Sequence, residues 1–229
     1  MTSRLSRQEI SDTVGDSGWR LVLEAVRTTV PVTSLAQGAE VAARAVAAAG
    51  DEGAASLWMD VRADRVVLTL QSPAIGWPTP RELDLARAVS AAVGELGLRT
   101  HPGLGDPVSR PVQMIEIAID ALDIAAIRPF WKAVMGYTDA PGASGPDDAI
   151  ADPLRQGPAI WFQQMDAPRP QRNRIHLDIS VPHEEAGPRV AAALAAGGVL
   201  LSDAKAPAFW VLADAEGNEA CVTTWQGRE

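Results

Sequence analysis

The sequence has one cysteine, Cys221, and three histidines, none of which comes before residue 101. A single cysteine excludes an internal disulfide framework and fits a reducing compartment. No apolar run approaches the roughly 20 residues of a membrane-spanning helix. The first residues also lack the apolar centre of a secretory signal. We therefore expect a cytoplasmic protein that does not enter a membrane.

Basic residues are the second shortage. The chain has 20 Lys and Arg against 29 Asp and Glu, which gives a formal net charge of −9. An acidic surface repels phosphate backbones, so we expect no nucleic-acid partner. Hydrophobic residues make up 47% of the 229 residues, which is enough for one large core or two small ones.

The first half alternates between helical and strand patterns. Thr79-Pro-Arg-Glu82 is a helix-capping box with proline at the first helical position. Ser34 can cap an alanine-rich helix that Gly50 ends. The order is αββαββα, which predicts an α+β sandwich with helices on one face of an antiparallel sheet. The expected helices cover residues 6–15, 34–49 and 79–96, and the expected strands cover 19–24, 26–32, 57–61 and 65–70.

Several segments of this half resemble pterin-4a-carbinolamine dehydratases, over residues 4–98. They are Arg4-Leu-Ser, Gly18-Trp19, the alanine-rich helix, Arg65-Val-Val-Leu-Thr-Leu70 and Thr79-Pro-Arg-Glu-Leu-Asp-Leu-Ala86. The resemblance implies a lyase that dehydrates 4a-hydroxytetrahydrobiopterin, with a His-His-Pro motif and one later histidine. Those positions fall on Ala55-Ser56-Leu57 and near Pro73 in this chain.

The missing histidines bear directly on the reaction. Dehydration of a carbinolamine needs one proton given to the leaving hydroxyl and one removed from nitrogen, and imidazole suits both because it titrates near neutral pH. Asp60 and Asp64 are the nearby carboxylates, and they also fit a polar hairpin. Trp58 and Trp77 fit either a pterin pocket or ordinary packing. We expect the dehydratase activity to be lost.

Residues 99–111 contain three prolines and two glycines, which indicates a linker. It divides the chain into domains at residues 1–98 and 112–229. The second of these domains contains an internal repeat with an offset of about 60 residues. The strand at 115–119, its helix and Gly136 are echoed by the strand at 175–179, its helix and Gly197.

The repeat predicts paired βαβββ units, and residues 112–226 resemble the glyoxalase-like or vicinal-oxygen-chelate fold. The similar segments are Phe130-Trp-Lys-Ala-Val-Met-Gly136, Arg174-Ile-His-Leu-Asp178 and Leu212-Ala-Asp-Ala-Glu-Gly-Asn218. We expect strands at residues 112–119, 149–152, 159–164, 174–181, 199–201, 209–213 and 220–225, and helices at 123–136 and 184–196.

Metal-using members of that family place one ligand on the first and last strand of each unit. The resemblance carries these positions to Glu116, His176 and Cys221, with Trp161 fourth. Glu, His and Cys can bind a divalent metal such as zinc, but Trp cannot. Without a metal, Glu116 and His176 fit a charge-assisted pair that binds or deprotonates a substrate. His176 also fits a hydrogen-bonded histidine, and Cys221 a buried apolar residue.

Residue type and position also suggest side chains that contact a small molecule. Arg174, with Arg169 and Arg172, fits either a contact for an anionic ligand or a solvated basic loop. Aromatic side chains of this half fit a wall for a flat ligand or core packing. The candidate substrate-binding residues are Trp131, Trp161, Gln163, Arg174 and Trp210.

Two functions remain open from the sequence. One is an enzyme-like fusion whose small-molecule site lies in the C-terminal domain. The other is a non-catalytic protein that binds a small ligand or mediates dimerisation. In both, we expect a small-molecule ligand, pterin-like or anionic, and a homo-oligomer. No cofactor is certain, and a divalent metal stays open.

Overall fold

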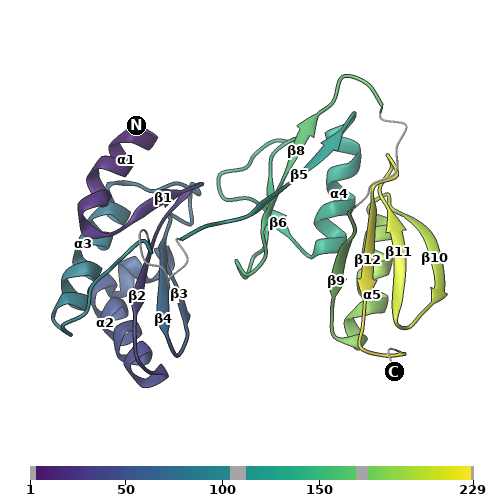
Figure 1. The fold of residues 1–229 in the computed structure, drawn as a ribbon. Helices are drawn as coiled ribbons and strands as arrows, with labels where there is room; N and C mark the ends of the chain where they lie inside the picture. The colour runs from purple at the N-terminus through teal and green to yellow at the C-terminus, as the bar shows by residue number, and fades with distance from the viewer. Residues whose placement is uncertain (1–3, 104–111, 169–174, 228–229) are drawn as a thin grey trace. The chain divides into compact units, whose positions relative to one another are not determined.

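The computed structural model describes residues 4–103, 112–168 and 175–227 (Figure 1). The chain divides into two compact units, Met1–Met114 and Ile115–Glu229. The finer boundaries suggested by the sequence, with a linker at residues 99–111, stay a prediction. Residues 104–111 of that linker lie outside the described residues.

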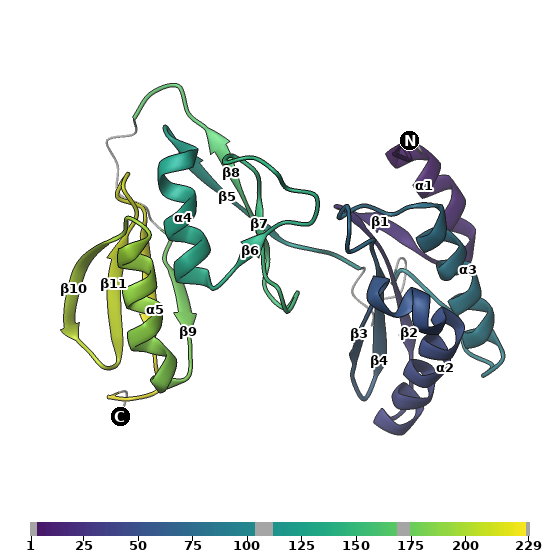
Figure 2. The same cartoon turned by 180° about the vertical axis from the view of Figure 1, so that it is seen from behind.

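The first unit has the αββαββα order expected from the sequence. Its four strands form one antiparallel sheet in the order β1-β2-β4-β3, and the three helices cover one face of it (Figure 2). The α-helices and strands are α1 (Arg7–Val14), β1 (Arg20–Val22), β2 (Ala25–Pro31), α2 (Leu35–Gly53), β3 (Leu57–Val61), β4 (Arg65–Leu70) and α3 (Pro80–Gly94).

Alternating side chains explain how this sheet and its helices pack. Val26, Val30 and Leu68 of the central strands are fully buried, and they share one hydrophobic cluster with residues of all three helices. Ser34 and Thr79 cap α2 and α3 as expected. Gly50 interrupts the helix as expected, because its φ of 61° and ψ of 177° are not helical and are readily adopted by glycine. A short second helical segment follows this kink to Gly53, and both segments are counted as α2.

The segment after α3 returns to this unit. His101 exchanges two backbone hydrogen bonds with Thr29 of β2, at 2.8 and 2.9 Å. The Thr100 hydroxyl donates to the Ser17 carbonyl at 2.7 Å. Gly18 permits this approach, because a Cβ there would lie 2.3 Å from the Thr100 carbonyl oxygen. Residues 100 and 101 therefore pack on the first unit.

The second unit contains the predicted pair of βαβββ repeats. The first repeat is β5 (Glu116–Ala121), α4 (Ile124–Met135), β6 (Thr138–Asp139), β7 (Ile150–Ala151) and β8 (Ala159–Gln164). The second repeat is β9 (Leu177–Ser180), α5 (His183–Ala195), β10 (Val199–Lys205), β11 (Phe209–Ala213) and β12 (Glu219–Thr223). Their sheets have the equivalent orders β5-β8-β7-β6 and β9-β12-β11-β10, and the first and last strands pair in parallel in both.

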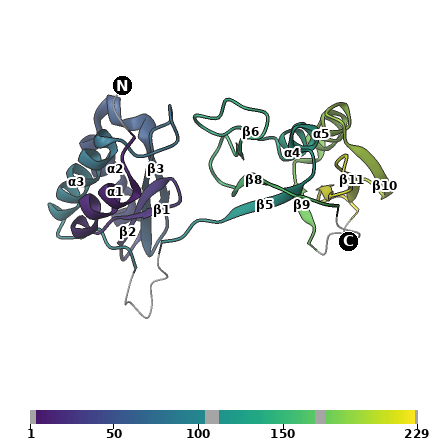
Figure 3. The same ribbon diagram turned by 90° about the horizontal axis from the view of Figure 1, so that it is seen from above.

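Both repeats share one core. Ile119, Phe130 and Ile160 of the first repeat belong to the same buried cluster as Leu212 and Val222 of the second. The helices α4 and α5 pack against each other and lie on the same side of both sheets (Figure 3). Each sheet therefore has a helix face and a second face that turns away from α4 and α5, which we call the open face.

A turn of the second repeat fastens the two repeats together. Asp214 is 2% exposed and accepts hydrogen bonds from the indole nitrogen of Trp131 at 2.9 Å and from the backbone nitrogen of Asn218 at 2.8 Å. Glu216 of the same turn accepts from the backbone nitrogens of Leu122 and Asp123. These are free donors at the N-terminal end of α4 in the first repeat.

None of the helices in the described residues has the length and apolar composition for crossing a bilayer.

Candidate functional site

One of the positions to which the resemblance carries the dehydratase histidines, Ser56, lies in a polar cluster that supports α3. Ser56 is 3% exposed and donates its hydroxyl to Glu82 at 2.8 Å. The Glu82 carboxylate also accepts from the backbone nitrogen and the hydroxyl of Thr79, at 2.8 and 2.6 Å. These bonds complete the capping box of α3. The Ser56 side chain is therefore committed to holding the helix start.

The other polar and aromatic groups near this place also have structural partners. Asp60 forms an exposed ion pair with Arg62, and Asp64 forms one with Arg65, each at 2.8 Å. Trp77 is 3% exposed and donates its indole nitrogen to the Leu5 carbonyl. It packs in the core, whereas Trp58 is half-buried on β3.

The open face of the first repeat carries two exposed candidate residues, Trp161 and Gln163. The β5 and β8 register places Ala118 beside Trp161 and Asp120 beside Gln163. Their neighbours along the strands, such as Ile119 and Phe162, point into the core. Trp161 is 38% exposed, and Gln163 is exposed. This face offers a flat apolar ring beside an amide and carboxylates.

The second repeat is closed at the equivalent place. All five residues of β12 are buried. The hydroxyls of Ser180 and Thr223 lie 2.8 Å apart and share a hydrogen bond between β9 and β12. Burial, followed by the negative charge of Asp178, raises the pKa of the Cys221 thiol to about 11. In the absence of a metal, the Cys221 thiol is therefore protonated near neutral pH.

The predicted Glu116 and His176 are both exposed, but they do not form the predicted pair. Glu116 is the first residue of β5, and His176 lies one residue before β9 rather than inside it. No hydrogen bond or ion pair joins their side chains in the part of the chain that the structure describes. Within the same residues, no group of three or more His, Cys, Asp or Glu side chains is placed to hold a metal ion. The donor set Glu116, His176 and Cys221 thus does not fit one.

The candidate substrate contacts separate between the two faces. Trp131 is 2% exposed and Trp210 is half-buried, and both pack in the core on the helix face. Trp161 and Gln163 lie on the open face. Arg174 lies outside the described residues. The assignment of these residues to a ligand stays a prediction.

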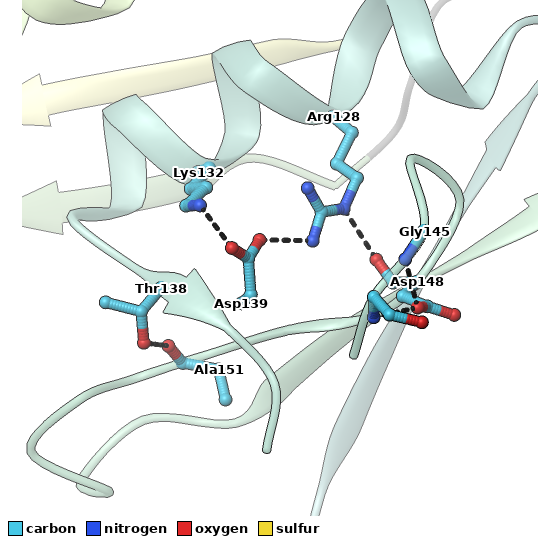
Figure 4. A network of polar contacts seen from close by, with 8 residues as sticks. Arg128, Lys132, Thr138, Asp139, Gly145, Asp148 and Ala151 are labelled. Atoms are coloured by element: carbon cyan, nitrogen blue, oxygen red, sulfur yellow. Dashed lines mark hydrogen bonds and ion pairs between the residues drawn. The ribbon is translucent and has the colours of Figure 1, made fainter. Parts of the chain in front are cut away.

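The sequence analysis did not predict a polar network of the first repeat, which joins α4 to β6 and to the loop before β7. Asp139 forms ion pairs with Arg128 and Lys132 of α4 (Figure 4). Hydrogen bonds from Lys132 and then Arg128 hold the pKa of Asp139 below its usual range. Arg128 also donates to the backbone carbonyl of Asp148 at 2.7 Å, and the Asp148 carboxylate accepts from the backbone nitrogen of Gly145 at 2.7 Å.

This network fixes the loop between β6 and β7. The two backbone donors, at Ser144 and Gly145, also lower the pKa of Asp148. The spacing of Arg128 and Lys132, one helical turn apart, is the only trace in the sequence that points to a shared acidic partner. That partner, Asp139, lies on a two-residue strand that the sequence pattern does not indicate.

Comparisons with known proteins found one matching family model and several similar solved structures. Residues 116–223, less than half of the chain, match the family model described as a glyoxalase-like domain. Similar solved structures include a glyoxalase/bleomycin resistance protein/dioxygenase family enzyme from Burkholderia phytofirmans PsJN and a glyoxalase-related enzyme from Fulvimarina pelagi. Both are 20% identical with a TM-score of 0.40, and they cover 48% and 49% of this chain and 95% and 88% of their own chains.

A third similar structure is a transcriptional coactivator/pterin dehydratase from Brucella melitensis, with 20% identity and a TM-score of 0.36. The match covers 39% of this chain and 98% of that chain. No curated protein matches the sequence. Both families named from the sequence thus occur among the matches, and residues 116–223 form a glyoxalase-like domain.

Proposed function

We propose that this protein binds a small, flat molecule on the open face of the first repeat, and that its N-terminal unit does not dehydrate 4a-hydroxytetrahydrobiopterin. The observation that carries the proposal is the exposure of Trp161 and Gln163 in the middle of β8. Their counterparts on β12, Cys221 and Thr223, are buried.

The composition of this face favours a planar ligand with hydrogen-bonding edges. An indole ring offers dispersion contacts and stacking to a flat molecule. Ala118 lies beside Trp161 and is too small to cover it. The Gln163 amide can donate and accept, and Glu116 adds a carboxylate at the start of the neighbouring strand. Glu116 and His176 are the candidate acid–base groups for a reaction of the bound molecule.

The N-terminal unit has no histidine at the positions where the resemblance places those of the dehydratases. Its one histidine, His101, accepts a hydrogen bond from the backbone nitrogen of Gly103 at 3.0 Å. No histidine occurs before residue 101, and general acid–base groups typically contribute ~10²–10⁴-fold to a rate. Ser56 is tied to Glu82 by a buried hydrogen bond, so it is not available as a substitute. Asp60 and Asp64 are exposed and paired with arginines.

The first test is dehydration of 4a-hydroxytetrahydrobiopterin by the purified full chain. We expect a rate equal to the spontaneous reaction. Clear turnover that disappears in Asp60→Ala would show that the N-terminal unit retained its activity by another route.

The second test measures binding by calorimetry, with a set of flat heteroaromatic compounds that includes pterin. We expect at least one compound to bind, and Trp161→Ala to weaken it about tenfold, because stacking on an aromatic ring typically contributes ~1–3 kcal/mol. The matched control is Trp225→Ala, which removes an indole that is 69% exposed elsewhere in the same unit. Equal losses in both variants would contradict the proposed site.

A further inference from the structure

We propose that His183, the first residue of α5, holds the side chain of Trp225 while its imidazole is neutral and releases it on protonation. Trp225 lies two residues beyond the end of β12. Its indole nitrogen donates a hydrogen bond to Nδ1 of His183 at 3.4 Å. The two rings meet edge to face, with centroids 5.5 Å apart and an interplanar angle of 80°. This contact joins the end of the last strand to the start of the last helix.

The same nitrogen of His183 has a second partner of the opposite kind. Nδ1 lies 3.2 Å from a carboxylate oxygen of Glu184, which can only accept a hydrogen bond, whereas the indole nitrogen of Trp225 can only donate one. In the neutral imidazole one nitrogen is an acceptor, and in the cation both nitrogens are donors. The neutral ring can therefore accept from the indole, and the cation can only donate to the carboxylate. Protonation changes the partner of Nδ1.

The charges around His183 determine which form is favoured. His183 lies at the N-terminal end of α5, where the helix dipole disfavours a cation. The Glu184 carboxylate favours the cation, but the two side chains are 40% and 73% exposed, so their attraction is weak. Within the part of the chain that the structure describes, Glu184 and Trp225 are the hydrogen-bonding and ionic partners of His183, and the adjacent Glu185 is paired with Arg189 at 2.9 Å. Because histidine changes its charge near neutral pH, mild acidification is sufficient to break the bond to the indole.

The side chain of Trp225 depends on this contact, whereas its backbone is held separately. Thr224 donates its hydroxyl to the Pro207 carbonyl at 2.6 Å, and the backbone nitrogen of Gln226 donates to that hydroxyl at 3.2 Å. The Trp225 residue itself is 69% exposed, so little apolar burial fixes its ring. The charged residues at positions 228 and 229 lie outside the described residues. Loss of the indole bond therefore frees the ring without detaching β12.

The test is a titration of the full chain from pH 8 to pH 5, followed by nuclear magnetic resonance of the indole signals and of the three histidine imidazoles. Trp225→Phe identifies the indole signal, and His183→Gln identifies the imidazole signal. We expect the Trp225 indole signal to move with the same midpoint as the His183 imidazole. The nuclear Overhauser contact between the two rings should be lost below that midpoint.

Three substitutions separate the protonation of His183 from a general effect of pH. In His183→Gln an amide oxygen can still accept from the indole but does not titrate, so the Trp225 signal should stay constant. Glu184→Gln removes the carboxylate that favours the cation, so the release should move to lower pH. The matched control is Glu185→Gln, which removes the adjacent carboxylate that is paired with Arg189 and should move the release less.

Two results would overturn the proposal. One is a Trp225 signal whose midpoint differs from that of His183, or that titrates unchanged in His183→Gln. The other is a contact between the two rings that persists at pH 5 after His183 has been protonated. Both results are independent of ligand binding on the open face of the first repeat.

Discussion

The two repeats of the glyoxalase-like domain have the same strand order but different last strands. On β8, Trp161 and Gln163 are exposed, whereas every residue of β12 is buried. The positions correspond through an offset of 60 residues, because Trp161 pairs with Ala118 and Cys221 pairs with Asp178 on the first strand of each repeat. A repeated backbone therefore carries two different surfaces.

This difference assigns the proposed ligand contacts to the first repeat and the stabilising turn to the second. The first repeat exposes groups that can contact a ligand, whereas the second repeat supplies the turn that joins the domain. Asp214 and Glu216 of that turn accept hydrogen bonds from Trp131 and from the N-terminal end of α4, both in the first repeat. A symmetric ligand site, with one equivalent group from each last strand, does not follow from the repeat alone.

The largest effect is expected from breaking the junction between the repeats. Asp214→Ala leaves the buried indole nitrogen of Trp131 without its acceptor and removes the bonds that shape the turn. We expect the free energy of unfolding to fall by about 2–4 kcal/mol, as for other losses of a buried hydrogen-bonded charge. Denaturant titration measures it. The control is Asp203→Ala on the exposed strand β10; a loss no greater than in this control would refute the role of Asp214.

The difference in burial between Trp161 and Cys221 can be tested by thiol chemistry. Because the pKa of Cys221 is raised to about 11, we expect a soluble disulfide reagent at pH 8 to react with the folded protein about a hundredfold more slowly than with the unfolded chain. A thiol moved to the equivalent position, in the variant Trp161→Cys with Cys221→Ala, should react quickly. Rapid labelling of Cys221 in the folded protein would contradict the burial of this thiol relative to position 161.

The same pKa gives the direction of a pH effect. Folding favours the protonated thiol, so its contribution to stability is complete below the ordinary cysteine pKa. The contribution is lost as the pH rises through that value towards about 11. In Cys221→Ala this component of the alkaline loss of stability should be absent.

A smaller effect is expected from the network behind the first repeat, which has no counterpart among the polar contacts described for the second. Asp139→Asn removes the charge shared by Arg128 and Lys132, and we expect a loss of about 1 kcal/mol or less, because Asp139 is half-exposed. The lowered pKa of Asp139 predicts that the wild-type advantage is present above the ordinary Asp value. It should disappear as the pH falls through the pKa of the folded state.

The matched control for this change is Asp147→Asn, which removes an exposed carboxylate in the adjoining loop. Thermal unfolding at pH 7 and pH 3 measures both variants. A destabilisation by Asp139→Asn that persists unchanged at pH 3 would show that the effect does not depend on the charge of Asp139.

The fold could be predicted from local patterns that the structure confirms. The capping box at Thr79 and the cap at Ser34 begin their helices as expected, and the helix expected from residue 123 begins with Asp123 as its cap. The 60-residue offset predicted both βαβββ repeats, because strand alternation and helix periodicity are present in each copy. The strand β7 lies inside the strand expected at residues 149–152. The two-residue strand β6 was not predicted, since it is too short to show alternation.

The candidate site was less predictable, because the relevant contacts join residues far apart in the sequence. Trp131 and Trp161 both fit a ligand wall by residue type, but one contacts Asp214 in the core and the other is exposed. Glu116 and His176 occupy equivalent starts of two strands without forming a pair. Burial and pairing depend on how the strands assemble, and composition alone does not determine them.

The most direct test of the account follows the seven tryptophan indole signals by nuclear magnetic resonance while flat heteroaromatic compounds, including pterin, are added. Trp161→Phe identifies the signal of Trp161. The account predicts that a bound compound shifts this signal and leaves those of Trp58 and Trp77 in place. Shifts confined to Trp58 and Trp77, or a Trp161 signal that no compound moves, would contradict a small-molecule site on the open face of the first repeat.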